Sequence, residues 1–256
     1  MKVSGIVIVT GPEESGLLDR SLPALRPQVD EVVVVANGPR SVDGGVPHGV
    51  RLLRNERMLG FSANINAGTS ATSGEYIVVS NPDAVPEPNA IAELVAFADA
   101  HPRCGVAGPK MINPDGTLQA SRRRFPTVAG TVVRRTPLRL LFPPLKWQRR
   151  HYLLDAPSHE PMQVDTMLGA FLLMRRTMLE EIGGWDAGYQ LYVEDIDVNY
   201  RAMKAGWERW WVPSAIVHHE YQAVIDKRFF TRRNWWHVKA MARFLRKHPE
   251  RLRALR

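Results

Sequence analysis

Short runs of apolar, mostly β-branched residues recur along the first third of the chain, each followed by polar, glycine or proline residues. The runs are Val3–Thr10, Glu31–Ala36, Val50–Arg54 and Tyr76–Val79. Runs that are apolar at consecutive positions are typical of strands buried on both faces of a parallel sheet. Residues 17–25 and 59–74 between them favour short helices, the second rich in small side chains. The pattern predicts an α/β domain with a mostly parallel, Rossmann-like sheet.

The second half of the chain continues with a less regular pattern. Ala90–Ala100 has the spacing of an amphipathic helix, and Thr177–Ile182 that of a shorter one. Val164–Arg175 is predicted to be one strand that lies across the ligand site of the sheet. Trp207–Val212 is a further predicted strand, and Ala215–His219 follows it.

Asn81, Pro82 and Asp83 stand directly after the apolar run that ends at Val79 and Ser80. Proline cannot continue the ladder and keeps its neighbours extended, so Asp83 is expected just beyond the carboxyl end of the strand. Ligands of open α/β sheets bind at that edge. A carboxylate with an asparagine two residues earlier suits a hard divalent cation that carries a diphosphate. The alternative is a turn that only ends the strand.

Composition narrows the functional classes. The single cysteine, Cys104, excludes an internal disulfide and is typical of a reducing cytoplasm. We expect no transmembrane helix and no signal peptide, and no glycine-rich dinucleotide fingerprint follows any predicted strand. The net charge of +8 is mainly a property of residues 221–256, which hold 11 Lys or Arg and 2 Asp or Glu.

Two basic segments allow more than one interpretation. Residues 122–150 hold nine basic residues and no acidic one, which predicts an irregular insertion beside an acceptor site or a solvated basic surface. In the tail, Trp235, Trp236, Phe244 and Leu245 recur at helical spacing among cations. This favours an interfacial helix on an anionic membrane, and packing against the domain is the alternative. Nucleic-acid binding is not expected, because the chain has no recognisable module for it.

Four short motifs follow one another in the first third of the chain: Leu59-Gly-Phe61, Asn66-Ala-Gly68, Gly74-Glu-Tyr76 and Asn81-Pro-Asp83. In this order and spacing the chain resembles family 2 glycosyltransferases, in particular the bacterial rhamnosyltransferase-like members. The resemblance runs from about Val3 to about His248. It implies a GT-A fold and a hexosyltransferase-type activity, with Asn-Pro-Asp in place of the usual Asp-x-Asp element.

The resemblance also implies which residues bind the donor, a nucleotide-diphosphate sugar. The implied donor-binding residues are Thr10, Asn37, Gly60, Asn66, Asn81 and Asp83. Asp83 and His218 are the implied ligands of Mg²⁺ or Mn²⁺, His218 standing at the end of the last predicted strand. A purely structural histidine is the alternative there.

Three acids, Glu194, Asp195 and Asp197, stand within four residues in a stretch that resembles the acceptor-side motif of the family. Transfer with inversion needs a base to take the proton of the acceptor hydroxyl. The resemblance assigns that role to Asp195, with Glu194 orienting the base or the acceptor and Asp197 supporting the start of the helix. Plain charge complementarity with a helix N-terminus is the alternative.

The sequence therefore predicts an inverting glycosyltransferase of cell-envelope polysaccharide synthesis, with rhamnose as a candidate sugar. The acceptor is expected to be a hydroxyl of a glycan or of a polyprenyl-linked sugar. We expect a GT-A domain over residues 1–220, with a nucleotide-sugar half to about 115 and an acceptor half from about 116, and a basic helical tail over residues 221–256. A cytoplasmic protein, peripheral on the inner face of the membrane, is the expected localisation.

Three departures from the family lie on the nucleotide side. Gly11-Pro12 replaces a usual Tyr-Asn pair, Ala36 replaces an aspartate before Asn37, and Met58 replaces an asparagine. They favour an alternative function, a catalytically weakened protein that binds a sugar or a partner. The presence of both Asp83 and Asp195 argues against it, since a binding module needs no base.

Overall fold

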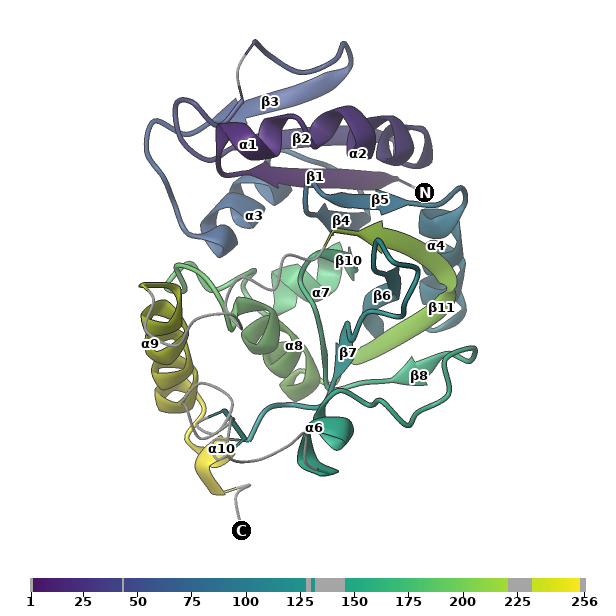
Figure 1. The fold of residues 1–256 in the computed structure, drawn as a ribbon, viewed down its shortest axis with the longest axis vertical. Coiled ribbons are helices and arrows are strands. Elements are labelled where there is room, and N and C mark those ends of the chain that lie inside the picture. Colours follow the sequence, from purple (N-terminus) through teal and green to yellow (C-terminus); the bar gives the residue numbers. More distant parts are fainter. Residues whose placement is uncertain (1, 43, 128–129, 132–145, 221–231, 254–256) are drawn as a thin grey trace.

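The computed structural model describes residues 2–42, 44–127, 130–131, 146–220 and 232–253. Its centre is a mixed sheet of nine strands flanked by helices (Figure 1). In spatial order the strands are β3 (Val50–Arg54), β2 (Glu31–Ala36), β1 (Val3–Val9), β4 (Tyr76–Ser80), β10 (Phe171–Arg175), β6 (Cys104–Ile112), β11 (Glu208–His219) and β5 (Ala84–Pro86), with β8 (Met162–Gln163) paired to β11. The four strands of the first part of the chain are parallel, as predicted.

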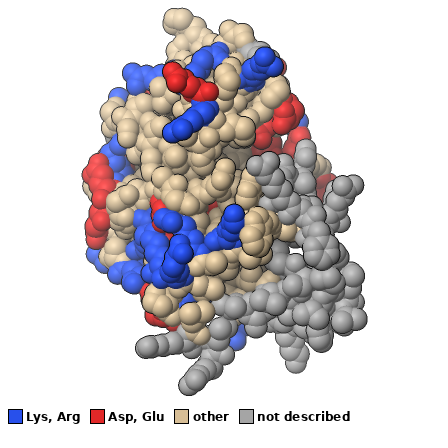
Figure 2. Space-filling model, turned by 90° about the vertical axis from the view of Figure 1, so that its left-hand side faces the viewer, with Lys and Arg blue, Asp and Glu red and all other residues tan. Residues whose placement is uncertain are grey.

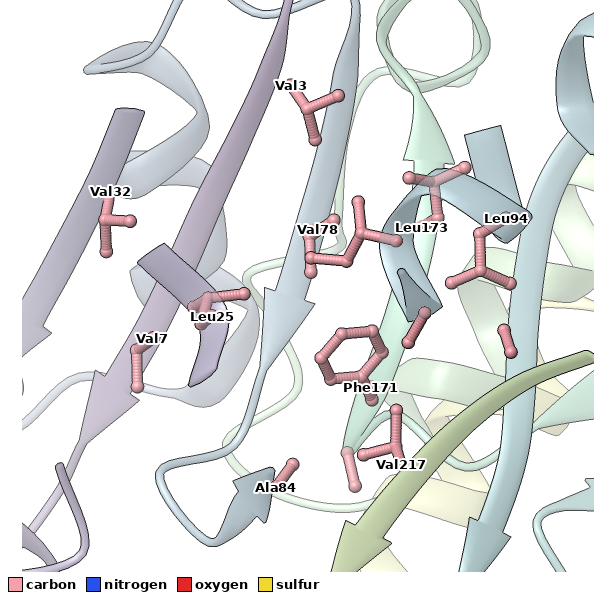
Figure 3. Close-up of a cluster of buried hydrophobic side chains, with 14 of the residues drawn as sticks. Val3, Val7, Leu25, Val32, Val78, Ala84, Leu94, Phe171, Leu173 and Val217 are labelled. Carbon is pink, nitrogen blue, oxygen red and sulfur yellow. The ribbon is translucent and has the colours of Figure 1, made fainter. Parts of the chain in front are cut away.

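Helices cover both faces of the sheet, which explains why its strands are apolar at consecutive positions. Successive residues of β1, such as Val7 and Ile8, enter opposite hydrophobic clusters. On one face lie α2 (Leu18–Leu25) and α4 (Ala90–Ala100), whose Leu25 and Leu94 pack among the strand valines (Figure 3). On the other lie α3 (Phe61–Ser70), α7 (Arg176–Glu181) and α8 (Glu194–Lys204).

The remaining elements are short or peripheral. They are α1 (Pro12–Ser15), the 3₁₀ turn η1 (Arg26–Gln28), α6 (Lys146–His151), α9 (Arg232–Lys247), α10 (Glu250–Arg253), and the two-stranded sheet of β7 (Arg122–Arg123) and β9 (Thr166–Met167). No helix among the described residues is long and apolar enough to cross a membrane.

The structure corrects two predicted strands. The segment predicted as one strand over Val164–Arg175 is two short strands, β9 and β10, in different sheets. The turn between them contains Gly169, a residue that favours a break in a strand. Conversely, the two segments predicted after Trp207 form one strand, β11, with a register shift between Val212 and Ile216 against β6. Pro213 lies in this irregularity.

The C-terminal helix α9 packs against the domain. Its Ala240, Met241 and Phe244 are buried in a third hydrophobic cluster, with Val193 and Tyr200 of the α8 region. Phe244 and Leu245 thus face the protein, whereas Trp235 is 57% exposed. Most of the basic insertion predicted over residues 122–150, and residues 221–231 of the predicted tail, lie outside the described residues.

Candidate active site

Strand β10 runs antiparallel between β4 and β6, so its first residue, Phe171, pairs with the last residue of β4, Ser80. This register brings the turn before β10 to the carboxyl edge of β4. The Asn81 amide donates to the Ala170 carbonyl at 2.7 Å, and the Gly169 amide donates to the Asp195 carboxylate at 3.4 Å. The turn therefore connects the Asn81-Pro82-Asp83 element to the first turn of α8.

Asp83 lies beside the end of β11, where His219 approaches its carboxylate with Nε2 at 3.3 Å. The imidazole is buried, and its Nδ1 lies 2.9 Å from Gln119 Oε1. The Gln119 amide nitrogen in turn donates to Asn113 Oδ1 at 2.8 Å, which leaves Gln119 Oε1 as the acceptor for an N–H of the ring. The proton on Nδ1 leaves Nε2 as the ring nitrogen that faces the Asp83 carboxylate.

His218, the histidine that the sequence singled out, lies elsewhere. Its Nε2 is 2.8 Å from Glu87 Oε1, and its side chain is 52% exposed. Adjacent residues of a strand point to opposite faces, so only one of the two histidines can face Asp83. The structure gives that position to His219.

A shallow depression adjoins Asp83. It is lined by Leu17, Arg20, Pro82, Val85 and Glu220 in addition to Asp83. The Arg20 guanidinium forms an ion pair with Glu220, whose backbone amide donates to the Asp83 carbonyl at 3.4 Å. A cation of α2 thus stands close to the carboxyl edge of the sheet, which the sequence analysis did not anticipate.

The two acids at the start of α8 differ in accessibility. Glu194 is buried with 9% exposure, and its Oε2 has no hydrogen-bond partner among the described residues. Asp195 is half-buried, and its carboxylate accepts from the Ile196 amide at 2.8 Å and from the Gly169 amide. Burial raises the pKa of Glu194, and the charge of Asp195 raises it further. Burial also raises the pKa of Asp195, an effect that the positive charge of Arg123 partly offsets.

Asp197 belongs to a different environment. It is fully buried and bonded to Arg201 Nε at 2.7 Å and to His248 Nε2 at 3.0 Å. Lys247 Nζ lies at 3.1 Å. Burial alone would raise the pKa of Asp197, but these groups lower it below its usual range. Asp197 therefore ties α8 to the end of α9 in addition to standing in the first turn of α8.

Two asparagines that the sequence assigned to donor binding use their side chains to hold backbone. The Asn37 amide group donates to the Leu59 carbonyl at 3.0 Å and accepts from the Leu59 amide at 2.7 Å. Asn66 does the same with Trp185, at 2.7 and 3.0 Å. Each side chain thus forms two hydrogen bonds with the backbone of one distant residue, which gives both asparagines a structural role that the sequence did not predict.

Gly60 lies where two motifs meet. A Cβ added to Gly60 would lie 2.5 Å from the Tyr189 carbonyl oxygen, and the neighbouring Phe61 amide donates to the Gln190 carbonyl at 3.2 Å. Such a close approach of two backbones accepts only glycine. The Leu59-Gly-Phe61 motif is therefore packed directly against the acceptor-side motif, about 130 residues later in the chain.

The remaining nucleotide-side residues lie at the carboxyl ends of β1 and β2. Thr10 is exposed, and its backbone amide donates to Glu14 Oε2 at 2.7 Å. Gly11 is the extended N-cap of α1, and Pro12 is the first residue of that helix. Ala36 is fully buried, whereas Met58 is 64% exposed. Where the family usually has an aspartate, this chain thus has a buried alanine that belongs to the hydrophobic core.

Comparison with known proteins decides the family. The model of the family described as "Glycosyltransferase like family 2" matches residues 21–246. The chain belongs to glycosyltransferase family 2. It is 32% identical over 245 residues to an N-acetylglucosaminyl-diphospho-decaprenol L-rhamnosyltransferase of Mycobacterium tuberculosis, a match that covers 86% of this chain and 76% of that protein. A shorter match, 35% identical over 82 residues, covers 32% of this chain and 31% of the rhamnosyltransferase WbbL of Escherichia coli.

Solved structures share the fold of this glycosyltransferase. GalNAc-T7, crystallised with UDP, GalNAc and Mn²⁺, superimposes with a TM-score of 0.67 at 18% identity over 96% of this chain and 48% of its own. The mannosyltransferase PcManGT of Pyrobaculum calidifontis, in complex with GDP-Man and Mn²⁺, gives 0.57 at 17% identity over 87% and 57%. This chain thus spans about half of each solved chain. The likeness confirms the predicted GT-A fold.

The edge around Asp83 fits a divalent cation by its donor chemistry. A carboxylate oxygen and an imidazole nitrogen face each other at 3.3 Å, an arrangement that a proton or a cation between them would stabilise. Carboxylate oxygen and imidazole are ligands of Mn²⁺ and similar metals. Among the described residues no group of three or more His, Cys, Asp or Glu could hold a metal ion, so diphosphate or water oxygens would complete the sphere.

Sequence reasoning missed several groups of this site. His219 adjoins the histidine that was chosen, but Gln119 and Arg20 carry no motif, and their role depends on contacts across the fold. Gly169 was assigned to a strand, yet its amide faces Asp195. A break in the apolar run at Gly169 is the one sequence signal that could have indicated a turn.

Proposed function

We propose that this enzyme transfers a sugar, with rhamnose as the first candidate, from a nucleotide diphosphate to a hydroxyl of lipid-linked N-acetylglucosamine, with inversion. The observation that carries the proposal is the turn before β10. The turn bonds Asn81, two residues before Asp83, through the Ala170 carbonyl, and Asp195 through the Gly169 amide. A site for the donor diphosphate and a site for a base then stand on two sides of one turn.

Asp195 serves as the general base in this proposal. It is the more accessible acid of the pair, and two backbone amides fix its orientation. Its raised pKa makes the carboxylate a better proton acceptor than an exposed aspartate. Burial and the charge of Asp195 raise the pKa of Glu194, which favours a neutral acid beside the ionised base. The proton of the acceptor hydroxyl passes to Asp195 as the oxygen attacks the anomeric carbon.

Asp83 and His219 hold the donor side. They are the residues that would bind a divalent cation, with His219 in place of His218 as the imidazole ligand. Mg²⁺ or Mn²⁺, when bound, supplies positive charge to the leaving diphosphate. Gln119 fixes the tautomer of His219, and Arg20 adds a cation at the rim, where it can exchange Glu220 for a phosphate oxygen.

The decisive experiment offers dTDP-, UDP- and GDP-sugars with a polyprenyl-diphospho-N-acetylglucosamine acceptor, with Mg²⁺ or Mn²⁺ and with EDTA. We expect turnover that requires the metal, and a product anomer opposite to that of the donor by NMR. A panel without turnover and without metal-dependent nucleotide binding contradicts the proposal. A product that retains the anomeric configuration contradicts only the role of Asp195 as general base.

The metal ligands can be tested apart from turnover. We expect His219→Ala to weaken Mn²⁺-dependent binding of the nucleoside diphosphate by calorimetry, because the imidazole beside Asp83 is lost. The matched control is His218→Ala, which removes the neighbouring imidazole that contacts Glu87. Equal binding by both variants and the wild type contradicts the choice of His219, and selective loss in His218→Ala restores the original assignment.

The lipid-linked acceptor further suggests where the enzyme works, namely peripherally on the inner, cytoplasmic face of an anionic membrane. The exposed side of α9 carries Trp235, Val238, Lys239, Ala242 and Arg246, one stripe by their helical spacing. Figure 2 faces the side of the molecule where α9 lies, and Lys and Arg side chains gather in its middle. An amphipathic stripe of aromatic, aliphatic and basic residues suits an anionic lipid surface.

Binding to vesicles tests this localisation. Each basic residue near an anionic surface contributes about 1 kcal/mol, an attraction that salt weakens. We expect sedimentation with phosphatidylglycerol-containing vesicles at low salt, reduced by Trp235→Ala and by added salt. An enzyme that ignores anionic vesicles even at low ionic strength contradicts the localisation and leaves the proposed reaction in place.

A further inference from the structure

One lysine on α9 touches both ends of the acceptor-side segment. Lys247 Nζ lies 2.8 Å from Asp186 Oδ2 and 3.1 Å from the carboxylate of Asp197. Both acids are largely buried, with 14% and 0% of their side chains exposed, whereas Lys247 itself is 31% exposed. The residues between the two acids include Glu194 and Asp195. A single ammonium group therefore joins the two ends of the segment that carries the acid pair.

This segment has a backbone that needs to be held. Tyr192 and Val193, directly before the acid pair, have φ angles of 71° and 70°. Left-handed geometry is unfavourable for residues with a Cβ and most unfavourable for a β-branched one such as valine. Backbone strain of this kind persists only where the surroundings fix it. Here α9 supplies them, because Met241 and Phe244 pack in one cluster with Val193.

Asp186 and Asp197 each have other partners besides Lys247. Asp186 also pairs with Arg243 at 2.8 Å, and Asp197 also pairs with Arg201 and His248. Removal of Lys247 therefore leaves neither carboxylate without a charged or hydrogen-bonding partner. What is lost is the group that links them, and with it the fixed distance between the start of the segment and the first turn of α8.

We propose that Lys247 is a positioning residue, which clamps Asp186 to Asp197 and thereby holds Asp195 in the geometry required of the base. The inference rests on the proposed function in taking Asp195 as that base. It makes the C-terminal helix α9 part of the catalytic architecture. The donor side, at Asp83 and His219, has no contact with Lys247 among the described residues.

The kinetic test compares Lys247→Met with Lys247→Arg. Because small displacements of a catalytic group are costly, we expect Lys247→Met to lower kcat about 10-fold or more, with KM for the donor within about twofold of the wild type. Lys247→Arg should restore most of kcat, since it can still reach two carboxylates. The matched control is Lys204→Met, which removes another α8-to-tail ion pair, at 2.9 Å to Glu250, and should leave kcat unchanged.

Hydrogen exchange supplies a readout that does not depend on turnover. In Lys247→Met, amides of residues 187–196 should exchange about 10-fold faster, while those of β1 and β4 stay protected. Unchanged exchange in the segment overturns the clamp, and faster exchange with an unchanged kcat overturns its positioning role. If the wild type turns over no donor, the proposed function fails, and the exchange data alone still decide whether Lys247 holds the segment.

Discussion

Asn66 provides a test of whether a family motif binds substrate or holds the fold. Its side chain makes two hydrogen bonds to the peptide of Trp185, at 2.7 and 3.0 Å, and Trp185 is 2% exposed. Asn66→Ala removes both bonds and leaves a largely buried N–H and C=O without those partners. Each lost bond costs about 1 kcal/mol, and an unsatisfied group raises that cost to about 1–3 kcal/mol. We expect the free energy of unfolding to fall by about 2–4 kcal/mol.

Urea denaturation measures this change, and thermal unfolding should show a decrease in Tm of about 5–15 °C for a domain of this size. The matched control is Ser70→Ala, at an exposed position of the same helix, where we expect less than about 0.5 kcal/mol. Calorimetry with a nucleoside diphosphate completes the test. A variant of wild-type stability that has lost donor binding would show that Asn66 contacts the donor and that the structural interpretation is wrong.

Three further predictions concern the base, the buried acids of the acceptor-side segment and the packing of α9. Asp195→Asn should lower kcat by about 10²–10⁴, measured by steady-state kinetics, while donor binding is kept. A kcat near that of the wild type would show that Asp195 is not the base. Burial alone would raise the pKa values of Asp186 and Asp197, but their cationic partners lower both pKa values. The two ionised acids therefore stabilise the folded protein fully above about pH 4, and this contribution is lost as the pH falls below it. Urea midpoints measured from pH 6 to pH 3 should decrease, and by less in the Asp186→Asn variant. Phe244→Ala should cost about 3–5 kcal/mol of stability because the ring is 1% exposed, whereas Trp235→Ala should leave unfolding unchanged. Equal effects of these two substitutions would mean that α9 does not pack as described.

The amino-acid sequence determined the elements that depend on local pattern. Consecutive apolar residues predicted β1, β2 and β4 because a strand buried on both faces cannot alternate. Pro82 located Asp83 beyond the end of β4, since proline cannot continue the ladder. The acids before the apolar positions of α8 indicated a helix start, which is where Glu194 lies. These features require only neighbours in the chain.

The choice between His218 and His219 required the tertiary structure. Side chains of a strand alternate between faces, so a change of register by one residue exchanges the two histidines. Strand β11 contains such an irregularity between Val212 and Ile216, and no sequence pattern reveals how many residues it absorbs. The sequence therefore pointed to the end of this strand, and the structure places His219 beside Asp83 and His218 beside Glu87.

The fold also decided what the motif residue Asn66 and the tail residue Lys247 touch. Asn66 binds a peptide 119 residues away, and Lys247 reaches Asp186 across 61 residues. Such contacts arise from how helices stack on a sheet, and the residues themselves carry no local signal of their partner. The sequence determined which groups the chain contains, and the packing of α3, α8 and α9 decided which of them meet.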